Sequence, residues 1–240
     1  MKRVRVATYN VHKCRGIDGR VRPGRIVDVL GEINADVIAL QEVLSCDGAS
    51  RELHQAGFIA DQLGMEYRIG ENRKLLGGAY GNVVLSRLPF QHVFNYDITV
   101  KGREERGSLR TDLVIDDQHV LHVFNVHLGT AYRERRHQAR RLVAPEILAH
   151  DELSGSRIVL GDFNEWTPGL ASRLLSAHFQ TPNTTQSPAR VRTLPAVAPL
   201  LPLDHIYYDQ SLDLISVALH RTRKSLVASD HLPLVADFRV

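Results

Sequence analysis

The chain has 240 residues, of which 43% are hydrophobic and 24% are charged, a composition that predicts a folded globular protein with a sizeable core and excludes a disordered one. The formal net charge is +3 and the isoelectric point is about 9.0, so the charge permits a phosphate-bearing or polyanionic partner without requiring one. We predict one large α/β domain over residues 1–240, because this length is within the range of a single unit of that class.

Hydropathy and cysteine content bear on the compartment. No window approaches the run of about 20 apolar residues that crosses a bilayer, so we expect no stable membrane insertion. The basic N-terminal segment is interrupted by Arg5 and has no small-residue cleavage pattern, which predicts a first strand and not a signal peptide. Cys14 and Cys46 are too few for a disulfide framework. We expect a cytoplasmic protein with free thiols, and the sequence leaves open whether the two cysteines pair.

The first half of the chain alternates predicted strands with predicted helices. Apolar runs that end on polar residues predict strands, and Pro23 near the start of helically spaced apolar residues predicts a helix that ends at Asn34. The glycine-rich segment 77–81 is not followed by Gly-Lys-Ser or Gly-Lys-Thr, which excludes a nucleotide-binding P-loop. The predicted elements are strands at 4–11, 36–43 and 83–86 and helices at 23–34 and 50–63.

The second half begins with three consecutive strands that we predict to pair antiparallel. A basic helix follows, whose arginines we interpret first as a solvated face, and the proline-rich segment 180–202 is predicted to be a surface loop. Because helices alternate with mixed parallel and antiparallel strands, we predict an α/β fold of two packed sheets covered by helices. The predicted elements are strands at 91–99, 108–115, 120–128, 158–161, 204–208, 215–219 and 234–240 and helices at 132–148 and 169–176.

Polar side chains end many of these strands. In Gly161-Asp-Phe-Asn164, which follows a buried apolar run, an acid and an amide two residues apart point to the same side of an extended segment. One such residue alone is more often a turn or capping residue, but a whole set with complementary chemistry favours one site beyond the strand ends. The set is Asn10, Glu42, His127, Asp162, Asn164, Asp204, Asp230 and His231.

This set predicts metal-dependent hydrolysis of a phosphoester. It is rich in hard oxygen donors and has no thiolate pair, so Mg²⁺ or Mn²⁺ is favoured over structural zinc. An ion held by Glu42 would polarise a phosphoryl oxygen and stabilise the leaving oxygen. His231 is a candidate general base for water, with its other ring nitrogen oriented by Asp204. Asp162 and Asn164 would position water and phosphate.

Phosphate contacts are expected from one histidine and from nearby arginines. His127 would donate a hydrogen bond to the phosphate or protonate the leaving group. Arg106 and Arg15 flank the predicted site. Such cations bind phosphate without reading a base sequence.

Seven short motifs follow one another along the chain: Thr8-Tyr-Asn-Val-His12, Leu40-Gln-Glu-Val43, Gly81-Asn-Val-Val-Leu-Ser-Arg87, Asn125-Val-His-Leu128, Gly161-Asp-Phe-Asn164, Asp204-His-Ile206 and Ser229-Asp-His-Leu-Pro233. Each alone is weakly specific, but the ordered set is highly specific. The set resembles the endonuclease/exonuclease/phosphatase superfamily, the metal-dependent phosphoesterases that include deoxyribonuclease I, abasic-site endonucleases, neutral sphingomyelinases and inositol polyphosphate 5-phosphatases.

This resemblance implies a fold and a division of roles. The implied fold is a four-layer αββα sandwich of two mixed β-sheets flanked by helices. His231, paired with Asp204, is implied to act near the attacking water. The implied ligands of the Mg²⁺ or Mn²⁺ ion are Glu42 as the principal one, Asn10 beside it, and Asp230 or Asp162.

Within the resemblance, His127 narrows the choice of substrate. Deoxyribonuclease-I-like and sphingomyelinase-like members carry histidine here, whereas abasic-site endonucleases carry tyrosine, which disfavours abasic-site repair. We expect hydrolysis of phosphodiester bonds in nucleic acid. The alternative is a phospholipid head group or small phosphoester, since the loops 77–80 and 195–203 are apolar enough to meet a lipid surface. A binding protein with a decayed site is least favoured, because every expected catalytic position holds a competent residue. No protein partner can be inferred.

Overall fold

The computed structural model describes residues 2–150, 153–182 and 191–240. Most helices and strands lie where the sequence predicts them. The described elements are β1 (Arg3–Asn10), η1 (His12–Cys14), α1 (Pro23–Ile33), β2 (Val37–Ser45), α2 (Gln55–Leu63), β3 (Glu66–Leu75), β4 (Gly78–Ser86), β5 (Phe90–Asp97), β6 (Gly107–Val114), β7 (Val120–His127), α3 (Tyr132–Leu142), β8 (Ser156–Asp162), α4 (Leu170–Ser176), β9 (Asp204–Tyr208), β10 (Asp213–Leu219), α6 (Ser225–Ala228) and β11 (Leu234–Arg239).

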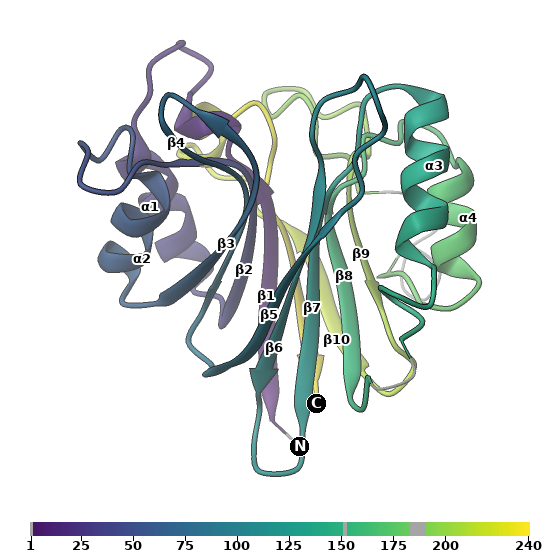
Figure 1. The fold of residues 1–240 in the computed structure, drawn as a ribbon. Helices are drawn as coiled ribbons and strands as arrows, with labels where there is room; N and C mark the ends of the chain where they lie inside the picture. The colour runs from purple at the N-terminus through teal and green to yellow at the C-terminus, as the bar shows by residue number, and fades with distance from the viewer. Residues whose placement is uncertain (1, 151–152, 183–190) are drawn as a thin grey trace.

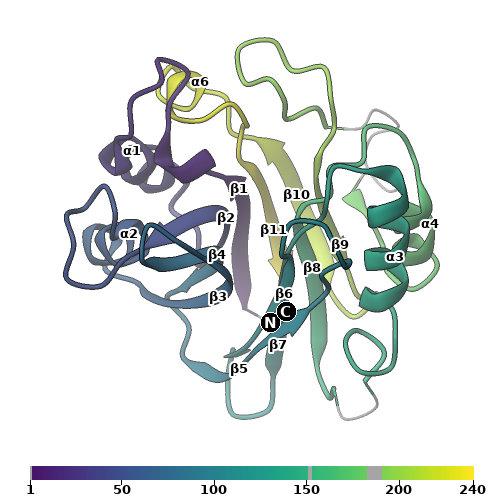
Figure 2. The same cartoon turned by 45° about the horizontal axis from the view of Figure 1, so that its top comes forward.

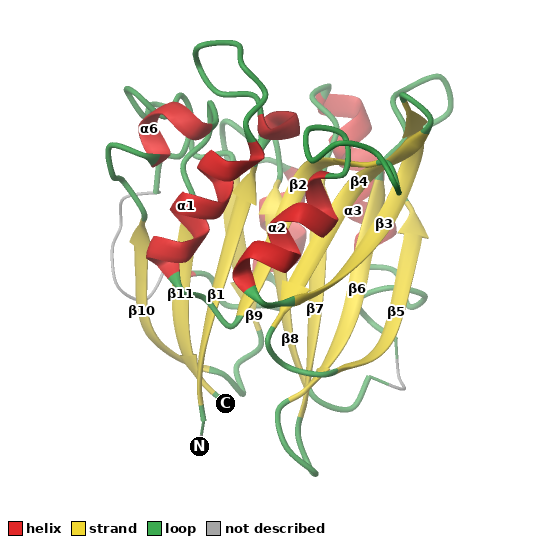
Figure 3. Ribbon diagram, turned by 90° about the vertical axis from the view of Figure 1, so that its left-hand side faces the viewer, coloured by secondary structure: helices red, strands yellow, loops and turns green. Residues whose placement is uncertain are grey.

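Two mixed β-sheets pack face to face at the centre of the structure (Figure 1). One has six strands in the order β10-β11-β1-β2-β4-β3, and the other has five in the order β5-β6-β7-β8-β9. Helices α1 and α2 cover the outer face of the first sheet, and α3 and α4 cover that of the second (Figures 1 and 3). The predicted αββα sandwich is confirmed. Cys14 and Cys46 are free thiols, as expected. No helix in the described part of the chain is long and apolar enough to cross a bilayer.

Strand direction brings the polar strand ends to one end of the sandwich. β1 runs parallel to β2, and β7 runs parallel to β8. The carboxyl ends of parallel strands lie at the same edge of a sheet. β4, β9 and β11 run antiparallel to these strands and therefore begin at that edge. The two ends of the chain lie at the opposite end (Figure 1), where Lys2 and Val240 exchange backbone hydrogen bonds.

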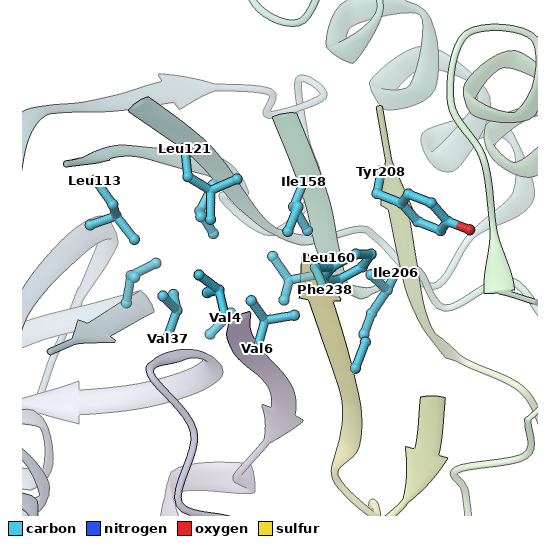
Figure 4. Close-up of a cluster of buried hydrophobic side chains, with 14 of the residues drawn as sticks. Val4, Val6, Val37, Leu113, Leu121, Ile158, Leu160, Ile206, Tyr208 and Phe238 are labelled. Carbon is cyan, nitrogen blue, oxygen red and sulfur yellow. The ribbon is translucent and has the colours of Figure 1, made fainter. Parts of the chain in front are cut away.

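Apolar side chains from both sheets fill the space between them (Figure 4). Alternate residues of a strand point to the same face, so Val4 and Val6 of β1 meet Ile158 and Leu160 of β8, with Phe238 of β11 beside them. All five are at most 1% exposed. Full burial of a side chain of this size contributes about 1.5–3 kcal/mol. This cluster therefore holds the strand ends of the two sheets in a fixed relation.

A buried polar bridge also joins the two sheets. The Nδ2 of Asn125 on β7 donates to the carbonyl of Leu40 on β2 at 2.8 Å and to that of Val83 on β4 at 2.9 Å. Its Oδ1 accepts from Nε2 of Gln41 at 2.8 Å. Asn82 of β4 donates in return to the backbone carbonyl of Asn125 at 3.1 Å. Because buried polar groups must keep their partners, this bridge fixes the register of one sheet against the other.

Two predicted helices are longer than those of the structure. Helix α3 ends at Leu142, well before its predicted end, because Pro145 has no amide hydrogen and disfavours helical geometry at the residue before it. Helix α2 begins at Gln55, later than predicted. The residues before it pair with β2 through a bridge between Ser45 and His54, and this tertiary pairing overrides the helical spacing.

Replacing Asn125 by leucine should lower the free energy of unfolding by about 3 kcal/mol or more. The leucine removes the side-chain donor to two buried backbone carbonyls and one of the acceptors of the Gln41 amide, and each hydrogen bond lost from a buried group costs about 1–3 kcal/mol. Denaturant unfolding measures the change. Gln118→Leu, at an exposed amide in the β6–β7 turn, is the control and should change stability by less than about 0.5 kcal/mol. A cost below about 1 kcal/mol for Asn125→Leu would show that the bridge does not hold the sheets.

Candidate active site

A cavity of about 470 Å³ opens at the end of the sandwich where the polar strand ends gather. Its apolar side includes Trp166. A larger cavity of about 600 Å³ lies on the outer face of the five-stranded sheet around Arg110 and Asp112, but none of the predicted strand-end residues lines it. Six of those eight residues line the smaller cavity, which is therefore the candidate active site: Asn10, Glu42, His127, Asp162, Asn164 and His231.

His231 lies between two buried carboxylates. Its Nδ1 is 2.8 Å from Oδ2 of Asp204, and its Nε2 is 3.7 Å from Oδ2 of Asp162. All three residues are buried. Burial opposes the charged form of the ring, but the charges of Asp204 and Asp162 outweigh it and raise the pKa of His231 to about 10. The ring is therefore an imidazolium near neutral pH, with a proton on each nitrogen.

Asn10 ties Asp162 to Glu42 across the floor of the cavity. Its Oδ1 accepts the backbone amide of His12 at 3.0 Å, which sets the orientation of the side-chain amide. Its Nδ2 then donates to Oδ2 of Asp162 at 3.0 Å and to Oε1 of Glu42 at 3.3 Å. Burial raises the pKa of Asp162, although the charge of His231 opposes this. One amide group thus bridges two carboxylates that come from different sheets.

Glu42 is an ionised carboxylate in the wall of the cavity. Its Oε2 accepts from Nζ of Lys13 at 2.8 Å and from the hydroxyl of Tyr80 at 3.1 Å. Burial opposes its ionisation, but the neighbouring His127 and Lys13 outweigh burial and lower the pKa of Glu42 to about 2. Glu42 therefore presents a full negative charge to any cation that enters the cavity.

Arg106 sets the tautomer of His127. Its Nη1 is 3.0 Å from Nδ1 of His127, and a guanidinium can only donate, so the ring proton is on Nε2. That nitrogen lies 3.6 Å from Oδ2 of Asp162 and 3.2 Å from Nδ2 of Asn164. Burial lowers the pKa of His127 to about 4 despite the charge of Asp162. The neutral ring therefore offers one N–H donor toward the cavity.

Backbone strain is concentrated around this cavity. Lys13, Glu42 and Asn164 have φ angles of 56°, 59° and 48°, a left-handed region that residues other than glycine rarely adopt. Each such conformation costs about 1–3 kcal/mol and persists only where the surrounding structure imposes it. Gly161 has a φ of 144°, and a Cβ there would lie 1.9 Å from the carbonyl oxygen of Val126. Only glycine lets β8 approach β7 so closely just before Asp162.

The donor set fits a hard divalent cation. Asp162, Asp204 and His231 each place one potential ligand atom within 4.8 Å of the others, and Oδ1 of Asp204 is buried without a hydrogen-bond partner among the described residues. Glu42 and Asp162 lie on either side of the Asn10 amide. Because Asp204 and His231 already bond each other, the carboxylate of Glu42 is the better placed ligand.

Three predicted site residues do not line the cavity. Asp204 is buried and bonds Nδ1 of His231, and Asp230 and Arg15 point elsewhere. The carboxylate of Asp230 lies 3.6 Å from Nδ1 of His12 and its side chain is 46% exposed. Asp230 and His231 lie in a bend before β11, in which the side chain of Asp230 turns outward and that of His231 turns into the cavity. Nε of Arg15 donates to the carbonyl of Gly19 in its own loop. Neither Asp230 nor Arg15 lines the cavity, so the metal role predicted for Asp230 and the phosphate role predicted for Arg15 have no geometric support.

Several polar residues of the cavity wall were not predicted from the sequence, among them Lys13, Arg73, Tyr80 and Glu104. Lys13 and Tyr80 line it and bond Glu42, while Glu104 pairs with Arg73 at 3.2 Å. Lys13 directly follows a motif that ends a strand, which is a usable signal. The others come from β3, β4 and the β5–β6 loop, and their sequence spacing gives no sign that packing brings them together.

Comparisons with known proteins bear on the family and the fold of this chain. YbhP of Escherichia coli (strain K12), described as an uncharacterized protein, is 32% identical over 248 residues, which cover 98% of this chain and 96% of YbhP. A functionally unknown conserved protein from Enterococcus faecalis V583 aligns with a TM-score of 0.82 at 17% identity over 98% of this chain and 99% of that one. The mannosyl-6-phosphatase Bt3783 of Bacteroides thetaiotaomicron VPI-5482 aligns with a TM-score of 0.78 at 15% identity over 99% of this chain and 100% of that one.

The two structural likenesses establish the fold alone, because their sequence identities are low. The family itself follows from the sequence matches. The model of the Endonuclease/Exonuclease/phosphatase family matches residues 7–231, which is nearly the whole chain. This protein therefore belongs to the endonuclease/exonuclease/phosphatase family, whose members are hydrolytic phosphoesterases.

Proposed function

We propose that this protein is a divalent-metal-dependent phosphoesterase that hydrolyses a phosphodiester bond by in-line attack of water. The observation that carries the proposal is the row of Asp204, His231 and Asp162, in which two buried carboxylates flank one imidazolium. The gap of 3.7 Å between His231 and Asp162 is too long for a direct hydrogen bond. Both atoms therefore remain able to bind a water molecule or a substrate oxygen.

The charge of His231 decides which group takes the proton of the attacking water. An imidazolium can donate but cannot accept, whereas burial raises the pKa of Asp162 and makes its carboxylate a better proton acceptor. We assign the proton to Asp162, while His231 orients the water or the phosphate by donation from Nε2. The sequence pattern predicts His231 as the general base and Asp162 as a group that positions water, so this assignment exchanges the roles of these two residues. Asp204 keeps the ring charged and correctly oriented.

Two donor groups, in addition to Nε2 of His231, face the place where the phosphate would lie. His127 presents its Nε2 proton, with the fixed charge of Arg106 behind it. The Nδ2 group of Asn164 donates to the carbonyl of Leu128 at 2.9 Å and lies 3.2 Å from Nε2 of His127, so the two groups are neighbours at this place. Donors that are already oriented stabilise negative charge as it builds up on phosphoryl oxygens in the transition state.

Glu42 is the proposed principal holder of the metal ion, with Asn10 beside it. Members of the family generally depend on divalent metals, and we propose Mg²⁺ or Mn²⁺ because the ligands are carboxylate oxygens. When bound, such an ion polarises a phosphoryl oxygen and offsets the charge on the leaving oxygen. Lys13 supplies positive charge to the same carboxylate of Glu42.

The cavity has features that suit two classes of substrate. Nucleic acid is the class expected from the sequence, and the position of Arg106 inside the cavity supports it. A phospholipid head group or small phosphoester is the alternative, and the apolar side of the cavity at Trp166 and Leu201 supports it. The name of the Bacteroides thetaiotaomicron mannosyl-6-phosphatase indicates that this fold also serves phosphomonoesters, so the fold does not select the substrate.

Replacing His231 by alanine should lower kcat on a soluble phosphodiester by at least about 10²-fold, since a positioned acid or base contributes at least that much. Steady-state kinetics with saturating Mg²⁺ measures the change. His119→Ala is the matched control, because His119 is exposed and pairs with Asp116 in the β6–β7 turn. A near-normal kcat for His231→Ala would remove this residue from the mechanism.

Replacing Glu42 by glutamine should weaken binding of Mg²⁺ or Mn²⁺ at least tenfold, because one carboxylate charge is lost from the ligand set. Isothermal titration calorimetry reports metal affinity without any turnover. Glu104→Gln is the control, since Glu104 lies in the same cavity but pairs with Arg73 and Arg106. If both variants bound the metal equally well, Glu42 would not be a ligand.

A panel of phosphoesters tests the proposed activity itself. Plasmid DNA, RNA, phospholipids, soluble model diesters and phosphomonoesters are incubated with Mg²⁺, with Mn²⁺ and with a chelator. We expect diester hydrolysis with either ion and none with the chelator, because the carboxylate ligands suit hard divalent cations. If none of these esters were hydrolysed in the presence of metal, the proposed function would be contradicted.

A further inference from the structure

Large apolar side chains are exposed on the loops around the active-site cavity. Among the described residues, the three most exposed are Leu76 at 71%, Leu200 at 64% and Trp166 at 60%. Leu76 lies at the β3–β4 turn with a φ of 50°, a conformation that leucine rarely adopts. Apolar residues at exposed turns are unfavourable in water, so a group of them marks a surface that meets something else.

Seven of the eleven exposed large apolar side chains of the described residues belong to loops at the cavity end, and the other four lie on β5, α3 and β10. Trp166 itself lines the cavity. The amide of Ile17 bonds the carbonyl of Val227 at 3.3 Å, and the carbonyl of Val197 accepts from Arg221 at 3.3 Å, so separate exposed loops lie next to each other. The loops concerned, which all extend from the same end of the sandwich (Figures 1 and 2), are 11–22, 75–78, 163–169, 191–203 and 220–230.

Two of these loops are basic. Residues 12–22 contain four lysines and arginines and one aspartate, and residues 220–230 contain three lysines and arginines and one aspartate. Arg20, Arg22 and Arg223 are exposed. Basic side chains interleaved with exposed apolar ones bind anionic bilayers, because the cations are attracted to the head groups while the apolar side chains enter the boundary below them.

Aliphatic side chains distinguish a bilayer from nucleic acid as the occupant of this surface. Single-stranded nucleic acid is held by aromatic rings that stack on bases and by cations that contact phosphates. Trp166 suits both occupants, but Leu76 and Leu200 offer neither stacking nor charge. Transfer to an acyl boundary, in contrast, removes their apolar surface from water.

We propose that the loops around the cavity dock this protein on an anionic phospholipid bilayer, with Leu76, Trp166 and Leu200 at the head-group boundary. The cavity then faces the lipid head groups, and, given the proposed phosphoesterase function, the hydrolysed ester belongs to a phospholipid head group. Water forms a bond to phosphorus, one P–O ester bond breaks, and the leaving oxygen takes up a proton to give an alcohol and a phosphomonoester.

Trp166 is the only tryptophan of the chain, so its fluorescence reports docking in the unmodified protein. Vesicles of phosphatidylcholine, with or without phosphatidylglycerol, are added in the presence of a chelator that prevents turnover. We expect a blue shift of the emission with the anionic vesicles and a smaller one with the neutral vesicles, because the indole leaves water for the bilayer interface. Unchanged emission with anionic vesicles would overturn the proposal.

Co-sedimentation with the anionic vesicles tests the loops themselves. The double variant Leu76→Ser/Leu200→Ser should bind at least tenfold more weakly than the wild type, since two inserted side chains lose their apolar surface. Ile215→Ser is the control, because Ile215 is 40% exposed but belongs to β10, near the opposite end of the sandwich. Thermal unfolding checks that each variant is folded. Wild-type binding by a folded double variant would contradict the proposal.

These experiments distinguish a failure of the docking proposal from a failure of the proposed function. If the wild type hydrolyses a soluble diester but ignores vesicles, the docking proposal is wrong and the proposed function stands. If it binds vesicles but turns over no phosphoester, docking stands and the proposed function falls. Binding of single-stranded DNA but not of vesicles, with loss of that binding in the double variant, would assign the surface to nucleic acid and overturn the bilayer proposal.

Discussion

Two buried carboxylates that share one imidazolium impose the main constraint on this site. Asp162 and Asp204 are each 1% exposed, and buried charges are strongly unfavourable unless they are paired and hydrogen-bonded. His231 pairs with both, and Asn10 gives Asp162 a further donor. In this arrangement, one face of the Asp162 carboxylate and the Nε2–H group of His231 point toward the cavity. The same pairing that makes the charges tolerable therefore prepares a proton acceptor beside a proton donor.

The fold matters because this site spans both sheets. Asn10 ends a strand of the six-stranded sheet and Asp162 ends a strand of the five-stranded sheet, yet their side chains are 3.0 Å apart. A small slip of one sheet past the other would separate them. The apolar cluster and the Asn125 bridge prevent that slip, and the left-handed backbone at Glu42 and Asn164 aims the last side chains. Packing energy thus stabilises strained positions that the local sequence would not adopt alone.

The positions of strand ends and of their polar residues were predictable from the sequence. The spacing and the length of apolar runs indicate where strands lie and where they end. Asp162 and Asn164 follow such a run at matching spacing, and the cavity contains both. Other features depend on tertiary packing. The side-chain direction of Asp230, the arrival of Glu104 at the cavity and the role of Asn125 between the sheets are set by contacts between distant segments. The charge of His231 likewise arises only when two remote carboxylates are buried beside it.

The protonation of His231 tests this account most directly. Nuclear magnetic resonance of the ring nitrogens in histidine-labelled protein, titrated with a chelator present, measures the pKa. We expect a value near 10 in the wild type and a lower value in Asp162→Asn, because one of the two carboxylate charges is lost. An ordinary pKa near 6.5 in the wild type would contradict the account. The ring would then be neutral at physiological pH, and His231, not Asp162, would accept the proton of the attacking water.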